Sequence, residues 1–274
     1  MTASPFASRL TLRVLALGYL ALLLAGPVAL VFYRTFEHGF GPAWDAVTTP
    51  EAQHAFWMTI LMVAVAVPVN TVFGIACAIV LARHHFRGKA LMNAAIDLPF
   101  AVSPVVIGLA LILVYGQDGW FSWFADHGIQ IIFSTPGMIL ATIFVSLPFV
   151  VREVVPVLRE IGTEQEQAAS TLGASGWQTF WRVTLPAIRW GVGYGVVLAT
   201  ARALGEFGAV SVVSGKVQGQ TETMTLFVEQ RFQQFDLTGA YAASVVLALL
   251  AIATLLTMNL FGAGADRGSR GREP

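Results

Sequence analysis

The chain has 274 residues, of which 56% are hydrophobic and only 12% are charged, and its 16 basic side chains balance 16 acidic ones. A soluble domain normally carries about 25% charged residues, and disordered chains are poor in hydrophobic residues, so both classes are excluded. The charge balance gives no indication of nucleic-acid binding. The single cysteine, Cys77, excludes an intramolecular disulfide and a cysteine metal cluster. With a mean hydropathy of +0.70, the sequence predicts a polytopic helical membrane protein.

Long runs without a charged or histidine residue predict the membrane-spanning helices. About 20 apolar residues in a helix cross the hydrocarbon layer. Several uncharged runs are long enough, and one further run is interrupted only by Arg202 and Glu206. We expect an all-α fold with six spans at about 14–33, 57–82, 95–115, 135–151, 190–213 and 239–262. The runs do not alternate polar and apolar residues, which argues against a β-barrel.

The first run also has some features of a secretory signal peptide, because Arg9 and Arg13 precede it. Its apolar stretch is longer than the 7–15 residues, roughly, of a signal peptide, and no clear Ala-x-Ala site follows. We therefore expect a span that is retained.

Lysine and arginine are distributed unevenly between the two sides of the predicted membrane. With the N-terminus inside, the inner segments hold Arg9, Arg13, Arg83, Arg87, Lys89, Arg152, Arg159, Arg182, Arg189, Arg267, Arg270 and Arg272. The outer loops hold only Arg34, Lys216 and Arg231. Because cytoplasmic loops are enriched in Lys and Arg, we expect a cytoplasmic N-terminal segment, 1–13, and a disordered cytoplasmic tail, 263–274.

The longest inner connection, 152–189, carries two helix signals. Thr163 and Glu166 fit a capping box, in which the hydroxyl accepts from the third backbone N–H and the carboxylate reaches back. Gly173 is placed to end this helix in a left-handed conformation. Ser175 and Gln178 fit a second, weaker box. We expect a helix, a glycine corner and a second helix.

Pro186 is expected to end the second helix, because proline cannot continue the hydrogen-bond ladder. The sequence is compatible with two contact surfaces for this hairpin, another protein or the lipid. Ala168 and Ala169 form a small face that another protein can approach closely, whereas the side that carries Trp177 and Trp181 suits a hairpin lying on lipid.

The same connection resembles the EAA loop of binding-protein-dependent ABC importer permeases. The family pattern is E-A-A, three residues, G, nine residues and I-x-L-P, and here the matching residues are Gln167-Ala168-Ala169, Gly173, Val183 and Leu185-Pro186. There are two departures. Gln167 stands where the family has Glu, although Glu166 precedes it, and Val183 stands where the family has Ile.

Three other segments resemble the sulfate/molybdate/tungstate branch of these permeases. They are RALGEFGA at 202–209, LPFAVSPVVIGL at 98–109 and GQTETMTL at 219–226, and the last is similar to the sulfate/thiosulfate permeases of the CysW type. The likeness covers about residues 10–262, which is nearly the whole chain.

The resemblance implies the transmembrane domain of a type I (MetI-like) ABC importer over 14–262, in a bacterial inner membrane. It implies two permease subunits, of which the second is a paralogue, two cytoplasmic ATPase subunits and a periplasmic binding protein that delivers sulfate or thiosulfate. The residues that it implies for ATPase coupling are Glu164, Glu166, Gln167, Ala168, Ala169, Leu172, Gly173, Leu185 and Pro186.

The sequence contains no P-loop of the G-x-x-x-x-G-K-[ST] form. We therefore expect that the chain is not an enzyme by itself and that a partner ATPase binds Mg-ATP. We expect no cofactor or metal in this chain. His84-His85 are adjacent and do not share a helix face, so a basic loop that meets anionic lipid is preferred to a metal site.

Two places along the spans are candidates for the anion path. Arg202 and Glu206 are four residues apart and are expected on one helix face, either as a structural or gating pair or with Arg202 contacting the anion. Pro99 and Pro104 are expected to break the third span. Ser103 beside this break is either a donor to an oxyanion or part of a packing kink.

Three rival functions stay open at this point. The near rival is a molybdate or tungstate permease, because tetrahedral oxyanions cannot be separated by these residues. The others are an ATP-independent channel or ion-coupled carrier, and a membrane-anchored scaffold.

Overall fold

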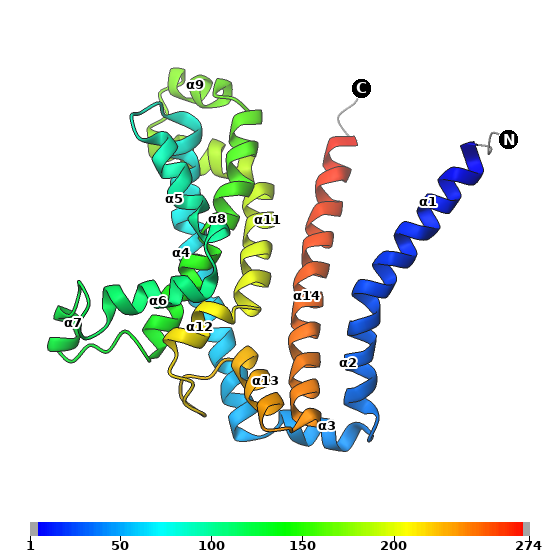
Figure 1. Ribbon diagram of the computed structural model, residues 1–274. Coiled ribbons are helices and arrows are strands. Elements are labelled where there is room, and N and C mark those ends of the chain that lie inside the picture. Colours follow the sequence, from blue (N-terminus) through cyan, green and yellow to red (C-terminus); the bar gives the residue numbers. More distant parts are fainter. Residues whose placement is uncertain (1–4, 271–274) are drawn as a thin grey trace.

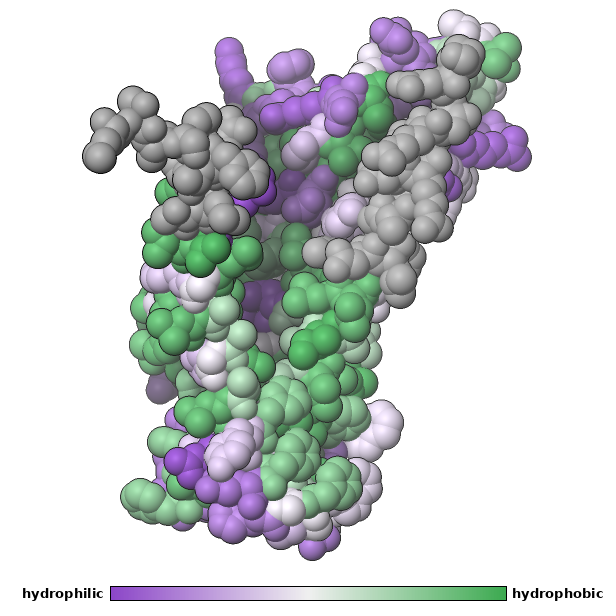
Figure 2. Space-filling view, turned by 90° about the vertical axis from the view of Figure 1, so that its right-hand side faces the viewer, coloured by the Kyte–Doolittle hydropathy of each residue, from purple (hydrophilic) through white to green (hydrophobic). Residues whose placement is uncertain are grey.

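The computed structural model describes the backbone of residues 5–270 and the side chains of residues 12–257. Every regular element in this range is helical (Figure 1). Five of the described helices are long and apolar enough to cross a membrane, and a sixth crossing is added if one bent helix pair counts as a span. Figure 2 shows the matching surface, with a hydrophobic belt at mid-height and hydrophilic residues toward both ends. The chain is therefore a multi-pass membrane protein.

The first half of the chain forms α1 to α7. Their bounds are α1 (Pro5–Leu20), the π-helical turn η1 (Ala21–Ala25), α2 (Gly26–Phe36), α3 (Phe40–Val47), α4 (Pro50–Arg83), α5 (Lys89–Ala101), α6 (Pro104–Tyr115) and α7 (Trp123–Asp126). In Figure 1, α1 and α2 run down the right-hand side from the N-terminus at the top, and α3 lies at the bottom. α6 and α7 project to the left of the bundle.

The second half forms α8 to α14. Their bounds are α8 (Thr135–Glu160), α9 (Glu164–Thr171), α10 (Gly176–Thr179), the π-helical turn η2 (Phe180–Thr184), α11 (Leu185–Leu204), α12 (Gly208–Val213), α13 (Met224–Gln233) and α14 (Leu237–Arg270). Figure 1 places α9, the start of α1 and the end of α14 at the same end of the molecule.

The centre of the bundle is formed by α4, α8 and α11, which meet at Val150. A Cβ built on Gly74 of α4 would lie 2.8 Å from the Val150 Cβ, and one built on Gly195 of α11 would lie 2.8 Å from the Val150 Cα. Small residues let membrane helices approach closely. Both neighbours of α8 therefore need glycine at the level of Val150, which is itself fully buried.

Two π-helical turns each end two residues before a proline. The Leu185 N–H donates to the Phe180 carbonyl at the end of η2, ahead of Pro186, and the Gly26 N–H donates to the Ala21 carbonyl at the end of η1, ahead of Pro27. The expectation that Pro186 ends a helix is therefore wrong. A local π-helical turn of this kind lets a helix accommodate a proline, and the helix runs on from Gly176 to Leu204.

Several helices extend beyond the predicted spans. α4 begins at Pro50, and α8 continues to Glu160, so the connection 152–189 is helical at its start. The tail 263–274, expected to be disordered, is helical to Arg270, whereas 271–274 and 1–4 lie outside the described residues. Charged residues mark where a helix leaves lipid, but they do not stop it, because the backbone bonds persist in water.

The predicted third and fifth spans are both broken. α5 and α6 are bent by 115° across Val102 and Ser103, and α11 is separated from α12 by residues 205–207. Pro104 is the first residue of α6, and extended backbone precedes it, as expected for a residue before proline. Pro99, in contrast, lies inside α5 and does not break it.

Candidate functional site

α9 is a short polar helix at the end of the bundle where α4 and α8 terminate (Figure 1). None of its residues is buried. Glu164, Gln167 and Ala168 are exposed, and Leu172, which follows the helix, is 89% exposed. Gly173 has φ +83° and ends the helix in the left-handed conformation that was expected. The arrangement presents small and apolar atoms to whatever lies beyond this end.

The two predicted capping boxes have opposite outcomes. Thr163 precedes α9 but makes no side-chain cap, and its hydroxyl accepts instead from the Gln167 amide at 3.0 Å. The box at Ser175 and Gln178 forms completely, with both reciprocal bonds present. The first prediction fails because Glu166, the residue that was expected to reach back, turns toward a cation.

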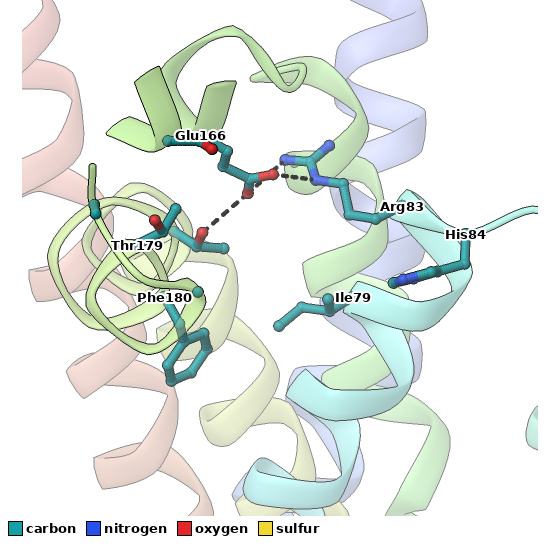
Figure 3. Close-up of a pocket in the computed structure, with 10 residues that line it drawn as sticks. Ile79, Arg83, His84, Glu166, Thr179 and Phe180 are labelled. Carbon is teal, nitrogen blue, oxygen red and sulfur yellow. Dashed lines mark hydrogen bonds and ion pairs between the residues drawn. The ribbon is translucent and has the colours of Figure 1, made fainter. Parts of the chain in front are cut away.

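Glu166 faces the bundle rather than the solvent beyond α9 (Figure 3). Its Oε1 accepts from Arg83 Nη2 at 3.2 Å and from Thr184 Oγ1 at 2.9 Å, and its Oε2 lies 3.0 Å from Arg83 Nε. Arg83 offers this carboxylate a charged donor, whereas the backbone N–H of a capping box is a neutral one. Glu166 is thus separated from the other predicted coupling residues of α9, which face outward.

The two parts of the EAA-like pattern meet across a groove. Ala168, Ala169 and Leu172 form one wall, and Val183 and Pro186 form the other. The groove has a volume of about 620 Å³ and also carries Arg182 and Arg189. Leu185 begins α11 beside Pro186. The structure therefore brings four of the nine predicted coupling residues to one open groove, namely Ala168, Ala169, Leu172 and Pro186.

The two broken spans pack against each other where they restart. A Cβ on Gly208, at the start of α12, would lie 2.8 Å from the Pro104 Cβ at the start of α6. A Cβ on Gly108 would lie 2.8 Å from the Val212 Cβ. The predicted path residues Ser103 and Pro104 thus lie on the element that packs against the helix following Glu206.

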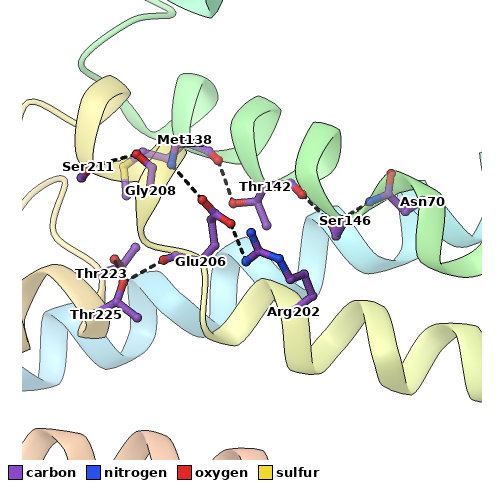
Figure 4. A network of polar contacts seen from close by, with 11 residues as sticks. Asn70, Met138, Thr142, Ser146, Arg202, Glu206, Gly208, Ser211, Thr223 and Thr225 are labelled. Carbon is purple, nitrogen blue, oxygen red and sulfur yellow. Dashed lines mark hydrogen bonds and ion pairs between the residues drawn. The ribbon is translucent and has the colours of Figure 1, made fainter. Parts of the chain in front are cut away.

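Glu206 lies in the break between α11 and α12 and is almost fully buried, at 2% exposed for its side chain (Figure 4). Its Oε1 accepts from the Ala209 N–H at 2.8 Å, which caps α12, and its Oε2 lies 2.6 Å from Arg202 Nη1. Thr225 Oγ1 donates to the Glu206 carbonyl at 2.8 Å. The Arg202 side chain is 29% exposed. Both carboxylate oxygens of Glu206 contact groups within the protein. Of the two side chains in this pair, Arg202 is therefore the one that a ligand can reach.

The sequence predictions missed three polar contacts between helices. Asp97 of α5 pairs in a bidentate manner with Arg152 of α8. The buried Asn70 of α4 donates to Ser146 Oγ on α8 at 2.8 Å. The third is the contact of Arg83 with Glu166. Pairs this far apart in sequence leave no local pattern, although a polar residue inside a predicted span is itself a signal.

A buried carboxyl lies in the connection between α12 and α13. Glu222 is 2% exposed, and its Oε2 makes no hydrogen bond. Burial raises the pKa of this carboxyl to about 7, while the charge of Arg231 lowers it and that of Glu51 raises it. Among the side chains that the structure describes, no group of three or more His, Cys, Asp or Glu is placed to hold a metal ion.

Comparison with known proteins places this geometry in a family. Residues 70–270 match the family described as "Binding-protein-dependent transport system inner membrane component". The chain is 55% identical to the sulfate transport system permease protein CysW of Synechocystis sp. over 92% of this chain and 91% of the relative. It is 50% identical to CysW of Synechococcus elongatus, with coverages of 95% and 92%.

Two further similarities concern a second permease and the fold. The sulfate transport system permease protein CysT, also of Synechococcus elongatus, is 41% identical, with coverages of 88% and 87%. The crystal structure of a bacterial ABC transporter that imports the acidic polysaccharide alginate contains a chain with a TM-score of 0.75 at 14% identity, covering 94% of each chain. The protein therefore belongs to the inner membrane components of binding-protein-dependent ABC transport systems, and within them to the family of the CysW permeases.

Proposed function

We propose that this chain is the membrane-spanning permease subunit of an ATP-driven importer that moves sulfate or thiosulfate from the periplasm to the cytoplasm of a bacterium. The observation that carries the proposal is the likeness to CysW permeases over nearly the whole chain. The geometry agrees with a permease, because a polar helix projects beyond the spanning helices and exposes Ala168 and Leu172.

The energy is proposed to come from a separate ATPase that contacts α9. The chain contains no P-loop, and the groove beside α9 is open and lined by residues of the EAA-like pattern. In this arrangement, the end of the bundle that carries α9, the start of α1 and the end of α14 is cytoplasmic. The basic residues Arg83, Arg182 and Arg189 lie toward the same end, in agreement with the positive-inside rule.

The second permease subunit is proposed to be a paralogue. CysW and CysT are separate relatives from one organism, and both resemble this chain over most of its length. A periplasmic binding protein is proposed as the donor of the anion, because the matched family is described as binding-protein-dependent.

The anion path is proposed to pass the two helix breaks that pack against each other, one between α5 and α6 and the other between α11 and α12. Transporters place their sites where discontinuous helices meet, and here the starts of α6 and α12 are in contact. Arg202 lies in the last turn of α11, just before the break, and its side chain is partly exposed. Glu206 lies 2.6 Å from Arg202 and offsets the charge of the guanidinium. We therefore propose that Arg202 contacts the anion weakly and transiently, as expected for a translocation path rather than a high-affinity binding site.

Uptake by the complete complex tests the proposal. Proteoliposomes with both permeases, the ATPase and the binding protein should accumulate ³⁵S-sulfate only with ATP, and excess thiosulfate should compete better than molybdate. A preference for molybdate would instead support the near rival. Uptake by this chain alone, driven by an ion gradient without ATP, would show an ion-coupled carrier.

A further inference from the structure

α9 lacks an apolar anchor to the rest of the protein. None of its residues is buried, so hydrophobic burial contributes little to its position. The chain enters α9 through Gly162, with φ +64°, and leaves it through Gly173, with φ +83°. A Cβ at either glycine would meet no atom within 4 Å. Side-chain packing therefore does not hold either joint, and the direction of α9 relative to the bundle depends on polar contacts.

Those contacts converge on Arg83, the last residue of α4. Its Nη1 donates to the Leu158 carbonyl near the end of α8 at 2.7 Å, while Nη2 and Nε face the two oxygens of Glu166. Thr184, at the end of η2, donates to the same carboxylate. The Arg83 side chain is only 12% exposed. One guanidinium thus connects α9 to the ends of α4 and α8, and Glu166 extends the connection to η2 (Figure 3).

We propose that Arg83 is the positioning residue that makes α9 move together with the spanning helices. With the contact intact, a displacement of α9 is transmitted to α4, α8 and η2. Without it, the same displacement is taken up by bending at Gly162 and Gly173. The inference deepens the proposed function, because it assumes that a partner acts on α9, but it does not depend on the identity of the transported anion.

The surroundings leave space for such bending. A cavity of about 370 Å³ lies beside the contact, lined by Ile79, His84, Thr179 and Phe180 in addition to the contact residues. Packing therefore does not fix α9 on this side. The planar fork of arginine reaches the Leu158 carbonyl and both Glu166 oxygens together, which the single ammonium of lysine cannot do. Arg83→Lys should accordingly retain the charge and lose part of the constraint.

The first test measures the position of α9 in the assembled complex. Spin labels at Glu160→Cys on the end of α8 and Thr171→Cys on α9, with Cys77→Ala as background, report the distance between these helices with and without a bound ATP analogue. We expect one narrow distribution for the parent chain and a broad one for Arg83→Gln. Arg87→Gln removes an exposed arginine of the adjacent turn and should leave the distribution narrow.

The second test compares ATP hydrolysis with uptake in the same complexes. Arg83→Gln should lose uptake while hydrolysis persists, and the exchange Arg83→Glu with Glu166→Arg should recover part of the uptake. If the complex with Arg83→Gln does not assemble, both measurements are made with Arg83→Lys and Thr184→Val instead. Neither of these variants leaves an unpaired charge. A distribution that stays narrow, or uptake that is retained despite a broad one, would overturn the inference.

Because the distance measurement needs no transported anion, its outcome is separate from the sulfate assignment. A complex that imports another oxyanion and still shows a broad distribution in Arg83→Gln would contradict the proposed substrate and support the positioning role.

Discussion

Gly208 and Pro104 lie in direct contact, so that a Cβ at position 208 would be 2.8 Å from the Pro104 Cβ. The two residues are the first of α12 and α6, the helices that restart after the two breaks. Their contact joins two discontinuous spans that are far apart in sequence. The two breaks are therefore packed directly against each other.

Gly208→Ala is expected to destabilise the protein. The added methyl would overlap the proline ring, and overpacking of this kind costs about 1–3 kcal/mol. The unfolding midpoint of the purified complex in detergent should fall. Gly193→Ala is the matched control, because a Cβ there meets no atom within 4 Å and alanine favours a helix over glycine by about 0.5–1 kcal/mol. Equal midpoints for the two variants would contradict the close contact.

Arg202 and Glu206 should respond unequally to neutralisation. Glu206 is 2% exposed and Arg202 is 29% exposed. Arg202→Gln leaves a buried carboxylate without its cation, which costs about 3–5 kcal/mol. Glu206→Gln leaves a guanidinium that water can reach and keeps an amide oxygen for the Ala209 N–H, so its loss of stability should be smaller.

The double variant tests the origin of this difference. Arg202→Gln combined with Glu206→Gln should be more stable than Arg202→Gln alone in the same unfolding assay, because no buried charge remains unpaired. If the losses of the two single variants instead add, the pair is not the source of the effect.

Much of the fold could be predicted from apolar runs. A charged residue is costly at any position within the hydrocarbon layer, so each span leaves a long, nearly uncharged run in the sequence. The break at Pro104 had a local cause and was also predictable. The break at 205–207 was not predicted, because glycine is tolerated in unbroken membrane helices and Glu206 was explained by its pairing with Arg202 on one helix face.

Within the candidate site, the local rules worked where no distant group intervened. Gly173 ends its helix as expected, since only its own backbone decides the conformation. The capping box at Thr163 failed because Arg83, 83 residues away from Glu166, takes the carboxylate. A sequence pattern of i and i+3 residues contains no information about such a partner.

Glu222 should make stability depend on pH. Its pKa is raised from an ordinary value of 4.5 to about 7, chiefly by burial, so the folded state holds a proton that the unfolded state releases. Its contribution is complete below about pH 4.5 and is lost as the pH rises to about 7. The free energy of unfolding should fall across this range, by no more than about 1.4 kcal/mol per pH unit, and the unfolding midpoint should fall with it. Glu222→Gln should flatten this decline, and an unchanged slope would exclude the carboxyl as its source.

Leu172 provides the sharpest test of the surface beside α9. The side chain is 89% exposed, so Leu172→Asp should not change the unfolding midpoint of the isolated subunit. If an ATPase covers the groove, the new carboxylate is desolvated on binding, and capture of the ATPase by the tagged permease should fall by at least about tenfold for a cost of 1.4 kcal/mol or more. Thr171→Asp adds the same charge at a neighbouring exposed residue that does not line the groove, and it should retain most of the capture. Equal capture by both variants and the parent chain would mean that the partner does not sit on this surface.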